Sequence, residues 1–290
     1  MANDGTVERL VDGIDFGEGP RWRDGRLWWS DFYQHTISSV APTGERRVEL
    51  EYGGQPSGLG WLPDGRLLFV SMLDRRLLRR EHDGSVVEHA DLSSIATDNC
   101  NDMVVDTTGR AYVGNFGFDL PGRADFAPAA LALVHPDGTV EQAADDLRFP
   151  NGSVIVPSTD GGATLIVGET FGGRYTAFDV DEATGRLSNR RIWAEIPGTA
   201  PDGCAVDAEG AIWFSDALGA QVVRVREGGE VAATIATSAP TYACMLGGDD
   251  GRTLFILTAV DSHPDQVAGT ATGAIYTTRV DVPRHPTAHP

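Results

Sequence analysis

The stretch that decides the fold is Gly-Pro-Arg-Trp-Arg-Asp-Gly-Arg-Leu-Trp-Trp-Ser-Asp, residues 19–31. It has the pattern of a short strand, a turn at Gly25 and a second, strongly apolar strand. The same order recurs at 58–70, 102–114, 151–168, 203–215 and 243–257. The turn glycines lie roughly 40 to 50 residues apart, which is the period of a propeller blade; they are Gly25, Gly65, Gly109, Gly162, Gly210 and Gly251.

Each unit continues with two further strand-like stretches. In the fifth unit these are 221–226 and 230–237, and Gly228 and Gly229 between them indicate a hairpin turn. Six units of four strands account for nearly the whole chain, and no segment keeps a helical period over a useful length. The sequence therefore predicts an all-β fold, a six-bladed β-propeller with four-stranded blades, as a single domain over residues 1–282.

The last unit is one strand short. After its third strand only 283–290 remains, and we expect this segment to be a disordered tail. A radial array of sheets has to protect its open edges, and closing the circle is the usual solution. The strand-like segment 6–11 is otherwise unassigned, so we expect it to supply the missing outer strand of the last blade.

The composition excludes several classes of function. The 290 residues carry a formal net charge of −19, and all 23 basic residues are arginine. Without lysine, Schiff-base catalysis and a phosphate-loop lysine are excluded. The negative charge disfavours nucleic acid and anionic membranes as partners, although it also serves solubility.

Neither a leader nor a membrane span is evident in the sequence. Residues 1–15 are polar, and the longest apolar runs, such as 67–70 and 254–257, are far too short to cross a bilayer. The three cysteines have no CxxC spacing, and their odd number argues against a disulfide framework. We therefore expect a soluble, cytoplasmic protein.

One position per unit should face the mouth of the central channel. The first strand of each blade is innermost, so the residues that open these strands form a ring; they are Glu18, Ser57, Asn101, Asn151, Asp202 and Tyr242. Four of them carry carboxylate or amide oxygens, the hard ligands that Ca²⁺ and Mg²⁺ prefer. Such residues also favour turns, but four at one phase of the repeat predict a cation site.

Loops that follow the second strands should surround the same mouth, because an antiparallel strand returns to the rim on which its partner began. The loops at 115–128 and 260–273 are long and typical of functional lids, whose mobility the sequence leaves open. His263, in the last of them, is a candidate for substrate contact. Apolar side chains in the loops after the second strands either line the mouth or anchor the loops; they are Met72, Phe116, Phe118 and Phe171.

At these residues the sequence resembles the family of senescence marker protein, gluconolactonase and luciferin-regenerating enzyme. The resemblance extends from residue 6 to residue 282. It implies a six-bladed propeller that hydrolyses a lactone, a related ester or a phosphorus–fluorine bond. The motifs that carry it stand in order at the matching phase of the repeat: Gly17-Glu18-Gly19-Pro20 with Trp22, Asn101-Asp102 with Asp106 and Gly109-Arg110, Phe149-Pro150-Asn151-Gly152, and Pro201-Asp202-Gly203-Cys204-Ala205.

The resemblance also implies roles for the ring residues. Glu18, Asn151 and Asp202 would be the protein ligands of a divalent metal, first of all Ca²⁺, with Mg²⁺, Mn²⁺ or Zn²⁺ as alternatives. Asn101 would be a further ligand or a substrate-binding amide. Asp202 would also be the general base.

One position departs from the family pattern. Sugar lactonases of the family often carry an arginine two residues before the third-blade asparagine, where it holds sugar hydroxyls, and here that position is Asn99. Together with the phenylalanines at the mouth, this departure favours a substrate less polar than a sugar lactone. Asn99 and Tyr242 complete the predicted substrate-binding residues.

The predicted reaction is opening of a small-molecule lactone or ester. A bound cation would polarise the carbonyl, and Asp202 would accept a proton from the attacking water. The alternatives are a phosphotriesterase-like hydrolase, a non-catalytic propeller with a structural cation, and a metal-free condensation like that of strictosidine synthase. The four oxygen-bearing ring residues argue against the last. The substrate, the metal bound in the cell and the oligomeric state stay open.

Overall fold

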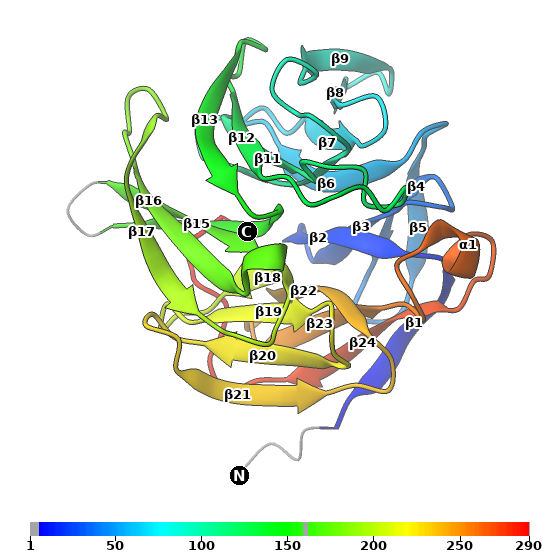
Figure 1. Cartoon of the computed structure of the whole chain (residues 1–290). Coiled ribbons are helices and arrows are strands. Elements are labelled where there is room, and N and C mark those ends of the chain that lie inside the picture. Colours follow the sequence, from blue (N-terminus) through cyan, green and yellow to red (C-terminus); the bar gives the residue numbers. More distant parts are fainter. Residues whose placement is uncertain (1–5, 159–161, 290) are drawn as a thin grey trace.

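The computed structural model describes residues 6–158 and 162–289. In these ranges 24 strands form six four-stranded antiparallel sheets. Figure 1 shows the sheets arranged as blades around a central axis. The predicted six-bladed β-propeller is therefore confirmed. The turn predicted around Gly162 falls partly on residues 159–161, which lie outside the described residues, as do 1–5 and 290.

In five blades the strands follow the chain from the axis outwards. The first blade contains β2 (Gly17–Arg23), β3 (Arg26–Asp31), β4 (Thr36–Val40) and β5 (Arg46–Glu51). The second contains β6 (Pro56–Trp61), β7 (Leu67–Ser71), β8 (Arg76–Arg80) and β9 (Val86–Asp91). The third contains β10 (Cys100–Val105), β11 (Ala111–Asn115), β12 (Ala129–Val134) and β13 (Val140–Leu147). The fourth contains β14 (Pro150–Pro157), β15 (Ala163–Glu169), β16 (Arg174–Val180) and β17 (Leu187–Glu195). The fifth contains β18 (Pro201–Val206), β19 (Ile212–Asp216), β20 (Gln221–Val225) and β21 (Val231–Ala236).

The sixth blade combines the two ends of the chain. From the axis outwards it contains β22 (Thr241–Gly247), β23 (Thr253–Thr258), β24 (Gly273–Arg279) and β1 (Glu8–Ile14). Glu8 pairs with Thr277, and Val11 pairs with Ile275. The predicted closure by an N-terminal strand is thus confirmed, and the first strand of the chain covers the edge of the last blade.

The inner strands pack closely enough to require glycine. Each contacts the inner strand of the next blade, and β22 returns to β2. A Cβ at Gly152 would lie 2.3 Å from the carbonyl oxygen of Asp202, and one at Gly58 would lie 2.5 Å from the nitrogen of Met103. Both glycines directly follow a ring position. The glycine in these motifs therefore serves the close approach of neighbouring blades.

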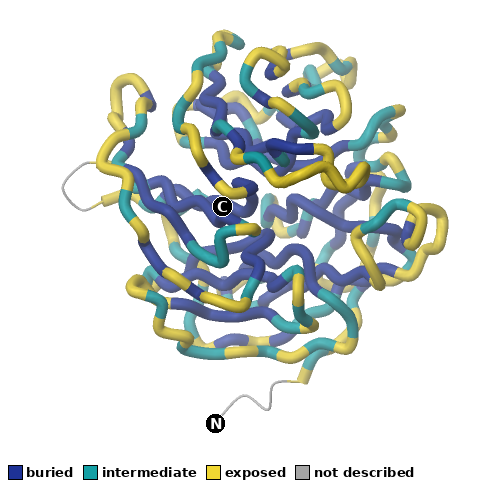
Figure 2. Tube along the Cα trace, in the orientation of Figure 1, coloured by how far each residue is buried: buried dark blue, intermediate teal, exposed yellow. Residues whose placement is uncertain are grey.

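The apolar core lies between blades. One buried cluster joins Trp29 of the first blade, Trp213 of the fifth and Phe255 of the sixth. Figure 2 shows that burial is concentrated in the strands near the axis, whereas exposed residues lie on the rim and in the loops. Two short helices, η1 (Thr170–Gly172) and α1 (Pro264–Val267), lie in loops that follow second strands. In the described part of the chain no helix has the length and apolar character that a membrane span needs.

The segment after β24 differs from the predicted disordered tail. Ile155 and His289 exchange backbone hydrogen bonds of 2.8 and 3.0 Å, and the N–H of His285 donates to the carbonyl of Val206 at 3.0 Å. The N–H of Arg284 donates to Gly251 at 2.8 Å. Residues 284–289 thus tie three blades together at the strand ends remote from the ring. Isolated bridges leave no period-two pattern, so the sequence does not reveal this pairing.

Candidate active site

Each of the six predicted ring positions is the second residue of its inner strand. In the first blade the register of the inner pair shifts directly after Glu18, and in the other five blades it shifts across the ring position itself. Pro201 pairs with Asp216 and Cys204 with Phe214, so β18 has one residue more than β19 between these pairs. Such a bulge turns a side chain out of the normal alternation and is frequent beside active sites. A register shift thus lies at or directly after the ring position in every blade.

The four oxygen-bearing ring residues are buried, with exposed fractions of 5 to 6%; they are Glu18, Asn101, Asn151 and Asp202. Two further charged residues, Arg21 and Asp102, are buried beside them, although the sequence assigned neither of them a role in the site. Nη2 of Arg21 donates to Oδ1 of Asp102 at 2.9 Å and also to the carbonyl of Met103. A charged residue inside an otherwise buried inner strand is the signal that could have revealed both.

Each carboxylate of this group makes ionisation of its neighbours less favourable. Burial, together with the charges of Asp202 and Asp102, raises the pKa of Glu18 well above its usual value. Burial and the charge of Asp102 likewise raise the pKa of Asp202. Desolvated like charges disfavour ionisation, and a bound cation would reverse that effect.

The residues present fit a divalent cation. Glu18, Asp102 and Asp202 supply three negative charges when ionised, and Arg21 supplies one positive charge, which leaves two negative charges without compensation. Oδ1 of Asp202 is buried without a hydrogen-bond partner. Within 6–158 and 162–289 no three His, Cys, Asp or Glu side chains are grouped for a metal. Amide oxygens would therefore have to complete the ligand set, which favours Ca²⁺ or Mg²⁺ over softer metals.

The side chain of Asn151 is oriented by the loop after β15. Its Nδ2 donates to Oγ1 of Thr170 at 3.1 Å, and that hydroxyl donates to the carbonyl of Pro201 at 2.8 Å. Because the amide nitrogen is used in this way, the amide oxygen is the atom left for a ligand. The same two bonds connect the fourth and fifth blades beside Asp202.

The predicted substrate residues occupy different surroundings. The ring of Tyr242 lies 4.7 Å from that of Phe16, and burial, with the charges of Asp261 and Asp202, raises its pKa to about 12. Its hydroxyl therefore stays protonated and can donate a hydrogen bond. Asn99 lies just before β10, and its carbonyl accepts the N–H of Phe116 at 2.9 Å.

His263 is held within its own loop. It precedes α1, and its Nδ1 accepts the N–H of Asp265 at 3.3 Å. Its side chain is 37% exposed. The contacts described for His263 thus cap a helix, and a role in substrate contact remains a prediction.

The mouth phenylalanines are brought together with each other. Phe116 packs against a cluster that contains Met72 and Tyr242, and Phe118 lies 5.5 Å from Phe171 between ring centroids. Two further phenylalanines join them, although neither was predicted to line the mouth; they are Phe126 and Phe149.

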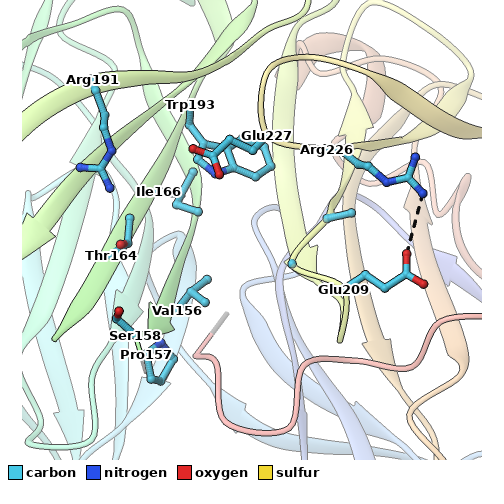
Figure 3. Close-up of a pocket in the computed structure, with 12 residues that line it drawn as sticks. Val156, Pro157, Ser158, Thr164, Ile166, Arg191, Trp193, Glu209, Arg226 and Glu227 are labelled. Carbon is cyan, nitrogen blue, oxygen red and sulfur yellow. Dashed lines mark ion pairs between the residues drawn. The ribbon is translucent and has the colours of Figure 1, made fainter. Parts of the chain in front are cut away.

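A separate groove of about 480 Å³ lies between the fourth and fifth blades (Figure 3). It is lined by the far end of β14, by β17 and by the turn at 209–211. Val156 lies five residues beyond Asn151, which is about 16 Å along a strand, so the groove and the ring are at opposite ends. Arg191 pairs with Asp179 at 2.6 Å, and Arg226 pairs with Glu230 at 2.9 Å. The two arginines that line the groove are therefore already paired with carboxylates, and the ring is the better candidate for a catalytic site.

Comparison with known proteins finds a family match over most of the propeller. The model for the SMP-30/gluconolactonase/LRE-like region matches residues 16–260. The chain is 27% identical to regucalcin from Danio rerio over 259 residues, which cover 84% of this chain and 83% of the relative. It is 25% identical to 6-deoxy-6-sulfogluconolactonase from Pseudomonas putida over 275 residues, 92% of each chain. It is 30% identical to diisopropyl-fluorophosphatase from Loligo vulgaris over 166 residues, 52% of this chain and 51% of the relative.

Solved structures show the same extent of similarity. A structure of luciferin-regenerating enzyme matches with a TM-score of 0.79 at 20% identity, covering 96% of this chain and 97% of that chain. A gluconolactonase from Xanthomonas campestris matches with a TM-score of 0.75 at 25% identity, covering 96% and 89%. The likeness in fold therefore extends over all six blades.

Proposed function

The chain belongs to the SMP-30/gluconolactonase/LRE-like family, and from this membership we propose that it is a metal-dependent hydrolase that opens a lactone at the mouth of the channel. Relatives named as lactonases or as a fluorophosphatase support a hydrolase. The observation that carries the metal dependence is the buried group of Glu18, Asp102 and Asp202, whose charge Arg21 compensates only in part. A divalent cation would balance it.

In this proposal Glu18, Asn151 and Asp202 hold the cation, which is Ca²⁺, and Asn101 is a fourth ligand or binds the substrate. The bound cation would polarise the scissile carbonyl and acidify water. Asp202 accepts the proton of the attacking water, because its Oδ1 is buried without another partner. Tyr242 donates a hydrogen bond to the substrate from its protonated hydroxyl.

The test is hydrolysis of aliphatic, aromatic and sugar lactones by purified protein, with chelator and with Ca²⁺ added back. We expect turnover that chelator abolishes and Ca²⁺ restores. Asp202→Asn should lower kcat by at least about a hundredfold. The exposed Asp83 allows the same change as a control, and Asp83→Asn should match the wild type. An Asp202→Asn protein that binds Ca²⁺ and keeps near-normal turnover would refute the general-base role.

A second candidate function is that of a phosphotriesterase-like hydrolase that cleaves a phosphorus–fluorine bond, which the 30% identity to diisopropyl-fluorophosphatase favours. It predicts Ca²⁺-dependent release of fluoride from a fluorophosphate, with no lactone turned over. A protein that binds Ca²⁺ and hydrolyses neither substrate would instead be a propeller with a structural cation. The cytoplasmic location also stays a proposal, which the three free, buried cysteines support.

A further inference from the structure

Five phenylalanines form a continuous cluster of ring contacts at the channel mouth, here called the phenylalanine wall: Phe116, Phe118, Phe126, Phe149 and Phe171. Neighbouring ring centroids lie 4.5 to 6.3 Å apart. The rings come from three separate segments, namely the loop after β11, the residue before β14, and η1. No single local turn brings them together, so tertiary packing alone accounts for the wall.

The inner end of the wall lies beside the ring. Only one residue separates Phe149 from Asn151. Phe149 stacks on Phe116 with a centroid distance of 4.5 Å and an interplanar angle of 25°. Phe116 in turn packs against the cluster that contains Tyr242. The buried end of the wall therefore lies two positions along the chain from the candidate ligand Asn151.

The outer end of the wall is open to solvent. Phe126 is 41% exposed and Phe171 is 45% exposed, and their centroids lie 6.1 Å apart. The two rings are exposed next to each other, and contiguous exposed apolar patches, unlike single exposed hydrophobic residues, mark interaction or ligand-binding sites. Apolar surface next to a few polar groups is the usual composition of a small-molecule site.

The backbone is strained at one residue of the wall. Phe149 has a φ of +65°, a conformation that bulky side chains rarely adopt. The N–H of Thr170 donates to the carbonyl of Phe149 at 3.1 Å, and the N–H of Phe171 donates to that of Arg148 at 3.1 Å. Glu169 accepts the N–H of Arg148 at 2.8 Å. Strain of this kind persists where the surroundings fix it, and it clusters at functional sites.

The loop after β11 is shaped in a similar way. Gly117 has a φ of +83°, and a Cβ there would lie 2.7 Å from the carbonyl oxygen of Ala127. This close approach brings the two ends of the loop together, so that Phe118 and Phe126 meet at 5.6 Å. The guanidinium of Arg148 lies 5.0 Å from the ring centroid of Phe126. The loop after β11 and the segments around Phe149 and η1 thus both shape the wall.

We propose that the phenylalanine wall binds a large apolar substituent, an aryl or medium-chain alkyl group, on the substrate ring and so determines specificity. That the bound molecule is a substrate rests on the proposed function. Binding of the apolar group to the wall does not itself require turnover. An aryl group on Phe126 and Phe171 would gain stacking and burial. Sugar hydroxyls at the same place would lose hydrogen bonds to water without finding partners on the rings.

The test uses two γ-lactams, which resemble lactones but resist hydrolysis: 2-pyrrolidinone and its 5-phenyl derivative. Binding is measured by ligand-observed NMR in the presence of Ca²⁺. We expect the phenyl lactam to bind at least about tenfold tighter. Phe126→Ala and Phe171→Ala should each remove most of this preference. Ile192 is 48% exposed on the outer strand β17, and Ile192→Ala should keep the preference as a matched control.

Equal binding of both lactams, or a preference that survives in both alanine variants, would overturn the proposal. Binding to phospholipid vesicles that the same variants abolish, without a lactam preference, would also overturn it and assign the wall to a membrane. Hydrolysis of the matching γ-lactones separates the two proposals. Phenyl-lactam preference without turnover of any lactone would contradict the proposed function but keep the binding site. Ca²⁺-dependent turnover of lactones without the phenyl-lactam preference would support the proposed function and contradict the binding site.

Discussion

Arg21 of β2 donates a hydrogen bond of 2.9 Å to Asp102 of β10 and so joins the first and third blades inside the channel. Both side chains are buried, with exposed fractions of 6% and 5%. The charge of Asp102 raises the pKa of Glu18 and Asp202, whereas Arg21 opposes the rise at Glu18. One ion pair therefore fixes two inner strands and sets the charge at the ring.

Removal of one partner of this pair should be costly. Arg21→Met would leave Asp102 buried without its counter-charge, and we expect the free energy of unfolding to fall by about 3–5 kcal/mol. Denaturant unfolding, with cation absent, measures the loss. Arg21→Met combined with Asp102→Leu should recover much of it, because no unpaired charge remains. A loss below about 1 kcal/mol in the single variant would mean that water or another group compensates Asp102.

Glu18→Gln should separate stability from cation binding. Burial and the charge of Asp202 make the ionised form of Glu18 unfavourable. Without cation, the variant should therefore melt a few degrees above the wild type, on the order of 2–4 °C per kcal/mol. Added Ca²⁺ should stabilise the wild type and leave the variant nearly unchanged, because one ligand charge is lost.

Scanning calorimetry with chelator and with Ca²⁺ measures both effects. Glu51 is exposed at the end of β5, and Glu51→Gln should respond to Ca²⁺ as the wild type does. A Glu18→Gln protein that melts lower without cation and still gains stability from Ca²⁺ would contradict the assigned ligand set.

The repeat and the ring positions could be predicted because each depends on local sequence. A turn glycine such as Gly210 marks the phase of its unit, and counting back from it finds Asp202. The pairing of β1 with β24 follows from the need to close a ring of sheets. The repeat and the ring positions use information within one blade, and the β1–β24 pairing uses a general rule about sheet edges.

What the sequence does not reveal depends on contacts between distant segments. The bulge at Asp202 leaves no mark in a strand that is buried on both faces. The approach of Arg21 to Asp102 joins blades that are not neighbours in the chain. Phe149 enters the wall through a backbone conformation that its own residue type disfavours. Propensity and periodicity carry no information on any of these.

Acid should loosen the segment that holds the wall. Burial alone would raise the pKa of Glu169, but hydrogen bonds from Arg174, Thr176 and the N–H of Arg148 hold it below its usual value. A lowered pKa means that the stabilisation is complete above the unfolded-state pKa, about 4.3, and is lost as the pH falls through the folded-state pKa. We therefore expect faster opening of the segment between Arg148 and Arg174 below about pH 4.

Hydrogen exchange, corrected for the intrinsic rate at each pH, measures this opening. In Glu169→Gln the same amides should already exchange faster at neutral pH and lose their acid dependence. Glu195 is exposed at the end of β17, so Glu195→Gln serves as the control. Protection that is independent of pH in the wild type would mean that the carboxylate of Glu169 does not hold the segment.

Truncation after Pro283 should destabilise the propeller without affecting the ring. Residues 284–289 hydrogen-bond to Ile155, Val206 and Gly251, in three different blades. With a net contribution of about 1 kcal/mol for each backbone bond, we expect the Tm to fall by about 5 °C or more. His289→Ala keeps the backbone bonds and should change the Tm by much less. Ca²⁺ binding should persist in the truncated chain, because these contacts lie at the opposite ends of the inner strands. An unchanged Tm would mean that the bridges add nothing to stability, and loss of Ca²⁺ binding would mean that the C-terminal segment also supports the ring.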